Sequence, residues 1–135
     1  MRVLLLGGTG NLGLRCIAAL LAHHHTVVLY VRNIPKLRSL VSPAILKAVE
    51  AIVLGDATNS ASIKQAILDH DIEGIIDVAG NQVYLWEELL LPKIAKAVAD
   101  AAVAVGKERG RPLRIWLVTG VNVLKYPGTT YLLGD

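Results

Sequence analysis

Short runs of apolar residues alternate along this chain with segments whose apolar positions recur every three to four residues. Unbroken apolar runs are typical of strands buried on both faces of a parallel sheet, and the longer spacing is typical of helices. Strands are therefore predicted at Arg2–Leu6, Thr26–Val31, Glu50–Leu54, Gly74–Val78 and Leu113–Thr119. Helices are predicted at Asn11–Ala22, Pro35–Val41, Ser60–Asp69 and from about Leu85 to Gly106.

The order of these elements predicts an α/β fold in which a doubly wound parallel sheet lies between two helical layers. Right-handed crossovers give the sheet the strand order 3-2-1-4-5. Ligands bind such sheets at the carboxyl ends of the strands, where the strand order reverses. We therefore expect one crevice from the loops that follow Leu6, Val31, Leu54, Val78 and Thr119.

Helical spacing also indicates which sides of two helices face the core. Pro92 is expected to start or kink the long helix, because proline lacks a backbone donor. The apolar positions that recur at this spacing are Leu12, Cys16, Ala19 and Leu20 in the first helix, and Leu91, Ile94, Ala95, Val98, Ala102 and Val105 in the long one.

Composition narrows the class of protein. With 135 residues, of which 53% are hydrophobic and 19% charged, the chain is expected to form a single globular domain over residues 1–135. No apolar run approaches the roughly 20 residues that span a bilayer, so no membrane association is expected. The single cysteine, Cys16, excludes an internal disulfide and fits a packing role in a reducing compartment, so a cytoplasmic location is expected.

Two clusters of polar residues are expected to be solvated loops. The net charge of +3 is modest, and the basic cluster near one loop lacks interleaved aromatic residues, so no nucleic-acid surface is predicted. The tract His23-His24-His25 lies at the sheet end opposite the crevice, and no nearby cysteine or carboxylate completes a metal site, so no metal is expected. The basic cluster consists of Lys107, Arg109, Arg111 and Arg114.

The strongest chemical signal follows the first strand. Residues 7–13 read Gly-Gly-Thr-Gly-Asn-Leu-Gly and match both Gly8-x-Gly10-x-x-Gly13 and Gly7-x-x-Gly10-x-x-Gly13. A strand that runs through a glycine turn into a helix lets the backbone approach a pyrophosphate, which the free N–H groups of the helix start can bind. This context predicts an anion site.

Three segments together resemble the atypical short-chain dehydrogenase/reductase families, with the nearest similarity to NmrA-like and flavin-reductase/biliverdin-reductase-like proteins. They are Gly7–Gly13, Val31-Arg32-Asn33-x-x-Lys36-Leu37 and Leu54-Gly55-Asp56. The resemblance covers most of the chain and is strongest over residues 1–60. It implies a Rossmann fold, a bound nicotinamide dinucleotide and usually an oxidoreductase activity, although some NmrA-like relatives bind the dinucleotide as a signal without catalysis.

The resemblance also implies cofactor-binding residues in the first loop. Gly7, Gly10 and Gly13 occupy the family's glycine positions, with Gly8 in the same turn. The pyrophosphate would then be lined by Thr9, Asn11 and Leu12.

Two later loops are expected to hold the rest of the dinucleotide. Asp56 would contact the adenine amino group, with the backbone N–H of Ala57 beside it, or cap the following helix, or do both. Small residues after the fourth strand, Ala79 and Gly80, would let the cofactor lie close to the backbone. Two neighbours could contact the cofactor or cap the next segment, namely Asn81 and Gln82.

The end of the second strand indicates which cofactor is bound. An NAD site has an Asp or Glu about 20 residues past the glycines to accept from the ribose hydroxyls. This chain has Arg32 there, with Lys36 one turn on, and a guanidinium pairs well with a 2′-phosphate. NADP(H) is therefore predicted over NAD(H), and a solvent-facing Arg32 is the alternative.

Catalytic residues are harder to identify. Thr119 ends the fifth strand, where relatives with an active-site Ser or Thr place it, and its hydroxyl could polarise a carbonyl or only satisfy the backbone. The usual acid–base partner is a Tyr with a Lys four residues on, which lowers the phenol pKa. None of the four tyrosines has a lysine at that spacing.

Three functions stay open. The chain is an NADPH-dependent reductase of a small carbonyl or ring compound, an NADP(H)-sensing regulator that engages a protein partner, or a truncated cofactor-binding form. Family members continue beyond Asp135, so we expect the C-terminal substrate-binding part to be lacking. A homodimer through the long helix or the fifth strand is expected to compensate, because that strand would otherwise be an unprotected edge.

Overall fold

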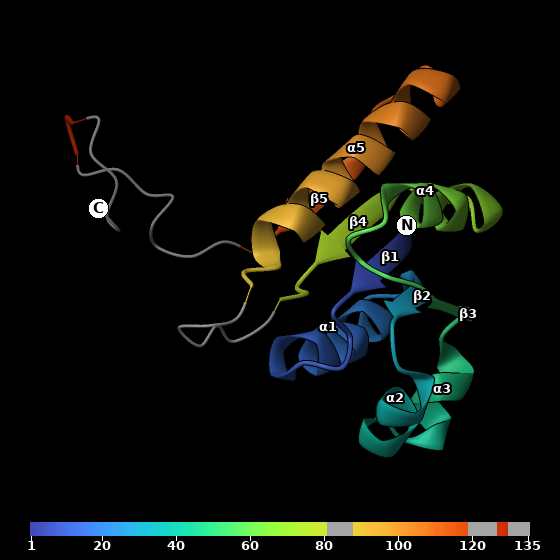
Figure 1. Ribbon diagram of the computed structural model, residues 1–135. Helices are drawn as coiled ribbons and strands as arrows, with labels where there is room; N and C mark the ends of the chain where they lie inside the picture. The colour runs from blue at the N-terminus through green and yellow to red at the C-terminus, as the bar shows by residue number, and fades with distance from the viewer. Residues whose placement is uncertain (81–87, 119–126, 130–135) are drawn as a thin grey trace.

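The structure is a computed structural model that describes residues 1–80, 88–118 and 127–129. Strands and helices alternate along it (Figure 1). The strands are β1 (Arg2–Leu6), β2 (Thr26–Val31), β3 (Ala51–Leu54), β4 (Gly74–Asp77) and β5 (Arg114–Leu117). The helices are α1 (Asn11–Ala22), α2 (Ile34–Leu40), α3 (Pro43–Ala48), α4 (Ser60–Asp69) and α5 (Leu91–Arg109).

The five strands form one parallel sheet with the order β3-β2-β1-β4-β5, which confirms the predicted topology. Its register aligns the strand ends, because Leu6 pairs with both Tyr30 and Asp77. Val31 likewise pairs with Leu54 at the outer strand. The loops after β1, β2, β3 and β4 therefore leave the sheet at one edge.

A helical layer covers each face of the sheet, as predicted (Figure 1). Leu4 and Leu6 of the central strand point to the face covered by α4 and α5. Leu5 points to the opposite face, where it packs with Ile17 of α1 and Leu37 of α2. All five side chains are almost fully buried, and such burial stabilises the fold by about 1.5–3 kcal/mol per side chain.

The sequence did not predict α3, and its start can be explained afterwards. Ser42 caps this helix by accepting a hydrogen bond from the N–H of Ile45, and Pro43 occupies the first turn. Serine before proline is a helix-start signal. A helix of six residues shows too little periodicity for that signal to be recognised.

The predicted limits of α5 were wrong at both ends. Residues 88–90 precede the helix, which begins at Leu91 because Pro92 belongs in a first turn. The helix continues past Gly106 to Arg109 and ends at Gly110, whose φ of 66° is the left-handed conformation of a helix stop. β5 is shorter than predicted, and Thr119 lies outside the described residues.

Both helices bury a face slightly rotated from the predicted one. In α1, Gly13 and Ile17 are buried, whereas Leu12 is 44% exposed. In α5, Leu91 and Ala95 are only half-buried, and two further alanines, Ala97 and Ala101, face the core. Small residues at these positions let α5 lie close to α4 and the sheet.

The histidine tract lies in the turn between α1 and β2, as expected. His23 and His24 end α1 at the edge of the sheet opposite the strand ends, and His24 has a φ of 60°. The described residues hold no group of three His, Cys, Asp or Glu side chains suited to a metal. Within the same ranges, no helix is long and apolar enough to cross a bilayer.

Candidate functional site

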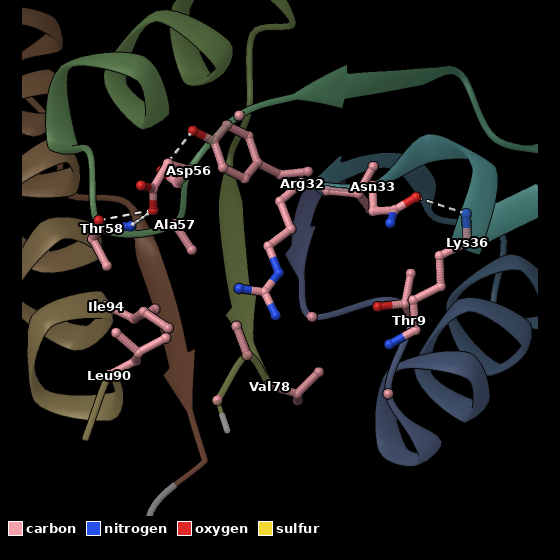
Figure 2. A pocket seen from close by; sticks show the side chains of 17 residues that line it. Thr9, Arg32, Asn33, Lys36, Asp56, Ala57, Thr58, Val78, Leu90 and Ile94 are labelled. Atoms are coloured by element: carbon pink, nitrogen blue, oxygen red, sulfur yellow. Dashed lines mark hydrogen bonds between the residues drawn. The ribbon is translucent and has the colours of Figure 1, made fainter. Parts of the chain in front are cut away.

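A cavity of about 370 Å³ opens at the carboxyl edge of the sheet (Figure 2). It lies among the loops after β1, β2, β3 and β4 and the start of α5, as the topology predicted. The predicted cofactor residues that line it are Gly7, Thr9, Gly10, Arg32, Lys36, Asp56, Ala57, Ala79 and Gly80. The lining residues that the sequence did not predict are Tyr30, Val31, Asn33, Gly55, Thr58, Val78, Leu90 and Ile94.

Close backbone contacts explain the glycines of the first loop. A Cβ atom on Gly13 would lie 2.0 Å from the carbonyl oxygen of Gly7, and one on Gly7 would lie 2.5 Å from the nitrogen of Ala79. Gly7 also has a φ of 83°, which other residues rarely adopt. The Gly10 N–H donates to the Gly7 carbonyl at 3.1 Å and closes the turn.

The start of α1 differs from that of the next three helices. Asn33, Ser42 and Asn59 cap α2, α3 and α4 with side-chain oxygens. Gly10 stands at the same position of α1 and offers no side-chain acceptor to the first amides. Since these N–H groups lie beside the cavity and carry the positive end of the helix dipole, they can bind an anion.

Other predicted residues of this loop have packing or surface positions. Gly8 is buried, and a Cβ on it would lie 3.5 Å from the Cδ1 atom of Ile17. Gly13 is also buried and does not line the cavity. Asn11 and Leu12 are exposed outside the cavity lining.

Two cations come from the segment after β2. Arg32 follows the strand directly, and its side chain extends into the cavity (Figure 2). Lys36 lies one turn into α2, which Asn33 begins by accepting the Lys36 N–H at 2.8 Å. The cap on α2 therefore places both cations on one wall of the cavity.

Asp56 organises the turn after β3. Its Oδ1 atom accepts the N–H and the hydroxyl of Thr58, both at 2.8 Å. These two bonds, and then the positive charge of Arg32, lower the pKa of Asp56. Asn59 rather than Asp56 caps α4, so the expected capping alternative for Asp56 was wrong.

The opposite wall of this part of the cavity is apolar. Leu90 and Ile94, at the start of α5, line it across from Arg32 (Figure 2). They lie beside Ala57, which packs against the same core cluster. An apolar wall facing a guanidinium and a carboxylate suits a flat, polar-edged ring system such as a purine.

Asp77 holds the loop after β4 in place through a hydrogen bond. Its side chain is 3% exposed, and Oδ1 accepts the N–H of Ala79 at 2.9 Å. Burial raises the pKa of Asp77. This bond holds Ala79 and Gly80 against the cavity.

Several predicted residues lie outside the described part of the chain. They are Asn81, Gln82 and Thr119. Of the four tyrosines, Tyr30 alone lies in the described ranges. Its hydroxyl is hydrogen-bonded to the turn after β3, so we do not assign it as a catalytic acid. The described residues therefore contribute a cavity lined by the glycine turn and two cations, and they leave the catalytic group unassigned.

Comparisons with known proteins agree with this geometry. A model of an NAD(P)H-binding family matches residues 7–124. No curated protein sequence matches the chain.

Solved structures share the fold at low sequence identity. A protein from Lactobacillus casei has a TM-score of 0.73 and 17% identity, over 98% of this chain and 55% of its own. The yeast methylglyoxal/isovaleraldehyde reductase in complex with NADPH has a TM-score of 0.73 and 18% identity, over 93% and 39%. The leucoanthocyanidin reductase–NADPH complex from Vitis vinifera has a TM-score of 0.60 and 22% identity, over 78% and 31%. This chain spans about half, or less, of the length of these proteins.

Proposed function

The chain belongs to the NAD(P)H-binding family whose model matches residues 7–124, and from that premise we propose that it binds NADP(H) and acts as an NADPH-dependent reductase of the atypical short-chain dehydrogenase/reductase type. The observation that carries the cofactor choice is the pair Arg32 and Lys36 on one cavity wall. At this place an NAD site would have a carboxylate.

The shape of the cavity supports one orientation of the dinucleotide. The pyrophosphate lies on the amides of the glycine loop, beside Thr9 and Gly10. The adenine lies between Arg32 and the apolar wall of Leu90 and Ile94, with its polar edge toward Asp56. The nicotinamide half then runs past Ala79 and Gly80, whose small size leaves room for it.

The 2′-phosphate is the feature that Arg32 and Lys36 recognise in this proposal. Both side chains are exposed at the cavity mouth, where a phosphate can keep part of its hydration. A charge-assisted hydrogen bond of this kind contributes about 1.5–3 kcal/mol, which corresponds to a preference of about tenfold to a hundredfold over NADH.

Bound NADPH supplies a hydride to an electrophilic carbon of a small carbonyl or ring compound. Of the described residues, Ala79 and Gly80 after β4 would lie beside the nicotinamide half. Carbonyl reduction also needs a proton donor, which stays unassigned, and Thr119, outside the described residues, is proposed to polarise the carbonyl with its hydroxyl.

A non-catalytic NADP(H) sensor is the second candidate. It is favoured by one sequence observation, the lack of any Tyr with a Lys four residues on. In that role the cavity binds the same cofactor, and the bound state is recognised by a protein partner.

Calorimetric titration with NADPH and NADH tests the binding proposal, and NADPH oxidation with quinones, flavins and aldehydes tests the activity. Tight NADPH binding with turnover supports the reductase. Tight binding without turnover on the whole panel supports the sensor. Equal affinity for the two cofactors contradicts the NADP(H) assignment, and no binding of either contradicts both candidates.

A further inference from the structure

Tyr30 is the one aromatic side chain among the described cavity-lining residues, and its position is unusual. It lies near the end of β2, in a strand otherwise built of Val, Leu and Thr, and is 2% exposed. Its ring belongs to the core beneath α4 and α5, while its edge reaches the cavity. A buried phenol needs hydrogen-bond partners for its hydroxyl.

Those partners are the turn after β3 and the first turn of α4. The Tyr30 hydroxyl lies 2.9 Å from the carbonyl oxygen of Asp56 and 2.8 Å from the Oγ atom of Ser62. A carbonyl can only accept, so Tyr30 donates its proton to Asp56 and accepts from Ser62. The same Asp56 carbonyl also accepts the N–H of Asn59 at 3.0 Å.

Gly55 allows the ring to reach this place. A Cβ atom on Gly55 would lie 2.2 Å from the Tyr30 hydroxyl oxygen and 2.4 Å from the ring carbon that bears it. The Gly55 N–H donates to the carbonyl of Val31 at 2.9 Å and continues the pairing of β2 with β3. The turn therefore packs closely against the hydroxyl end of the Tyr30 ring.

These contacts fix the turn that carries the Asp56 carboxylate and the Ala57 N–H, at the part of the cavity where adenine is proposed to bind. The Asp56 carboxylate is oriented by Thr58, and the main chain of Asp56, immediately before the Ala57 N–H, is held by Tyr30. Adenine presents a 6-amino donor beside an N1 acceptor, which complements a carboxylate beside an N–H. Hypoxanthine presents a 6-oxo acceptor beside an N1–H donor, so both contacts become unfavourable.

We infer that Tyr30 is a positioning residue for adenine recognition. With Gly55 beneath the turn, it sets the spacing between the Asp56 carboxylate and the Ala57 N–H, and this spacing distinguishes adenine from 6-oxopurines. This inference rests on the proposed binding of NADP(H). A purely structural Tyr30 would contribute to stability and would leave the choice of purine unchanged.

The test measures dissociation constants for NADPH, NADH and reduced nicotinamide hypoxanthine dinucleotide phosphate. The wild-type protein is expected to bind NADPH at least about tenfold more tightly than the hypoxanthine analogue, since two hydrogen bonds are reversed. Tyr30→Phe keeps the ring and removes the hydroxyl, and it is expected to reduce this ratio about threefold to tenfold. Its NADPH-to-NADH ratio is expected to stay unchanged, because Arg32 and Lys36 are not touched.

Two further variants separate positioning from loss of stability. Val105→Ala removes buried volume from the same core cluster at the far end of α5, so it destabilises the fold and is expected to keep the purine ratio. Ser62→Ala removes one of the two hydroxyl contacts of Tyr30 and is expected to lower the ratio less than Tyr30→Phe.

The outcomes distinguish this inference from the proposed function. If Tyr30→Phe keeps the full wild-type purine ratio, or if Val105→Ala loses it equally, Tyr30 is only structural and NADP(H) binding still stands. If wild-type protein binds NADPH without preferring it to the hypoxanthine analogue, adenine recognition by this turn is wrong. If the wild-type protein binds no dinucleotide, the proposed function itself fails.

Discussion

The backbones of Gly7 and Ala79 lie so close that a Cβ atom on the glycine would be 2.5 Å from the alanine nitrogen. The loop after β1 and the loop after β4 therefore touch through main-chain atoms alone. In the proposed orientation these loops hold the pyrophosphate and the nicotinamide half. A shift in one loop is thus transmitted directly to the other.

Two glycines of the first loop should separate folding from binding. A Cβ on Gly10 would meet only the Gly7 carbonyl oxygen, at 3.5 Å, so Gly10→Ala should cost no more than about 1 kcal/mol as a poorer helix cap. Its methyl group adds bulk to the wall that Gly10 lines and should abolish tight NADPH binding. Gly13→Ala overlaps the Gly7 carbonyl and should destabilise the fold by about 1–3 kcal/mol or more.

Urea unfolding and calorimetry on the two variants check this separation. Equal destabilisation by Gly10→Ala and Gly13→Ala would contradict the packing role assigned to Gly13. Full NADPH affinity in Gly10→Ala would contradict the placement of the pyrophosphate.

Arg32→Ala should lower the affinity for NADPH about tenfold to a hundredfold and that for NADH much less, so that most of the preference for NADPH is lost. The cause is the loss of a guanidinium partner for the 2′-phosphate, and Lys36→Ala should act in the same direction. Arg111→Ala removes the same charge from the opposite end of the sheet and serves as the control. An equal loss in the control would indicate a general effect of net charge.

Adenine recognition should persist well below neutral pH. The pKa of Asp56 is lowered from its usual 3.8 by two hydrogen bonds from Thr58, so the carboxylate stays charged down to and below that pH. A lowered pKa in the folded state stabilises the fold above 3.8, and this contribution is lost as the pH falls through the folded-state pKa. The preference for NADPH over its hypoxanthine analogue should therefore be equal at about pH 8 and about pH 5.

Asp56→Asn tests the same contact without a change of pH. The amide offers an N–H where the carboxylate offered an acceptor, so the purine preference should fall about tenfold or more. Asp69→Asn changes an exposed carboxylate at the end of α4 and is the matched control. If Asp56→Asn leaves the purine preference unchanged, Asp56 does not contact the adenine.

Asp77→Asn should be at least as stable as the wild type at neutral pH. Burial raises the pKa of Asp77, so the folded state binds the proton more tightly and stability falls as the pH rises from 3.8 through the raised pKa. The asparagine keeps an acceptor for the Ala79 N–H and removes this pH dependence. Asp77→Ala, which loses the acceptor, should cost about 1 kcal/mol, and unfolding curves across this pH range measure both effects.

The sequence predicted the sheet well because strand order depends on a few long-range rules and on unbroken apolar runs such as that of β1. It also located the first loop, since glycine spacing carries a backbone requirement. It did not predict the contact of Tyr30, whose main partner is a main-chain carbonyl 26 residues away. No spacing rule encodes that contact, although a tyrosine within an aliphatic strand was a visible signal.

Backbone constraints explain the remaining differences between the predicted and the observed helices. Leu12 has a helical spacing typical of a core residue, yet Gly13 must lie against Gly7, and this contact turns Leu12 outward. The long helix begins at Leu91 and not near Leu85, because Pro92 takes the first-turn position that was one of its two expected roles. In both cases a backbone constraint outweighed the apolar pattern.

Because α1 has no side-chain cap, binding of the cofactor there would be coupled to the stability of the fold. On the proposed function, the phosphate oxygens of the cofactor complete a helix end that Gly10 leaves open. A ligand that binds the folded chain alone adds about 2.7 kcal/mol of stability at a hundred times its dissociation constant. The abundance of the protein would then follow the supply of its dinucleotide, because the chain that finds none unfolds and is degraded more often.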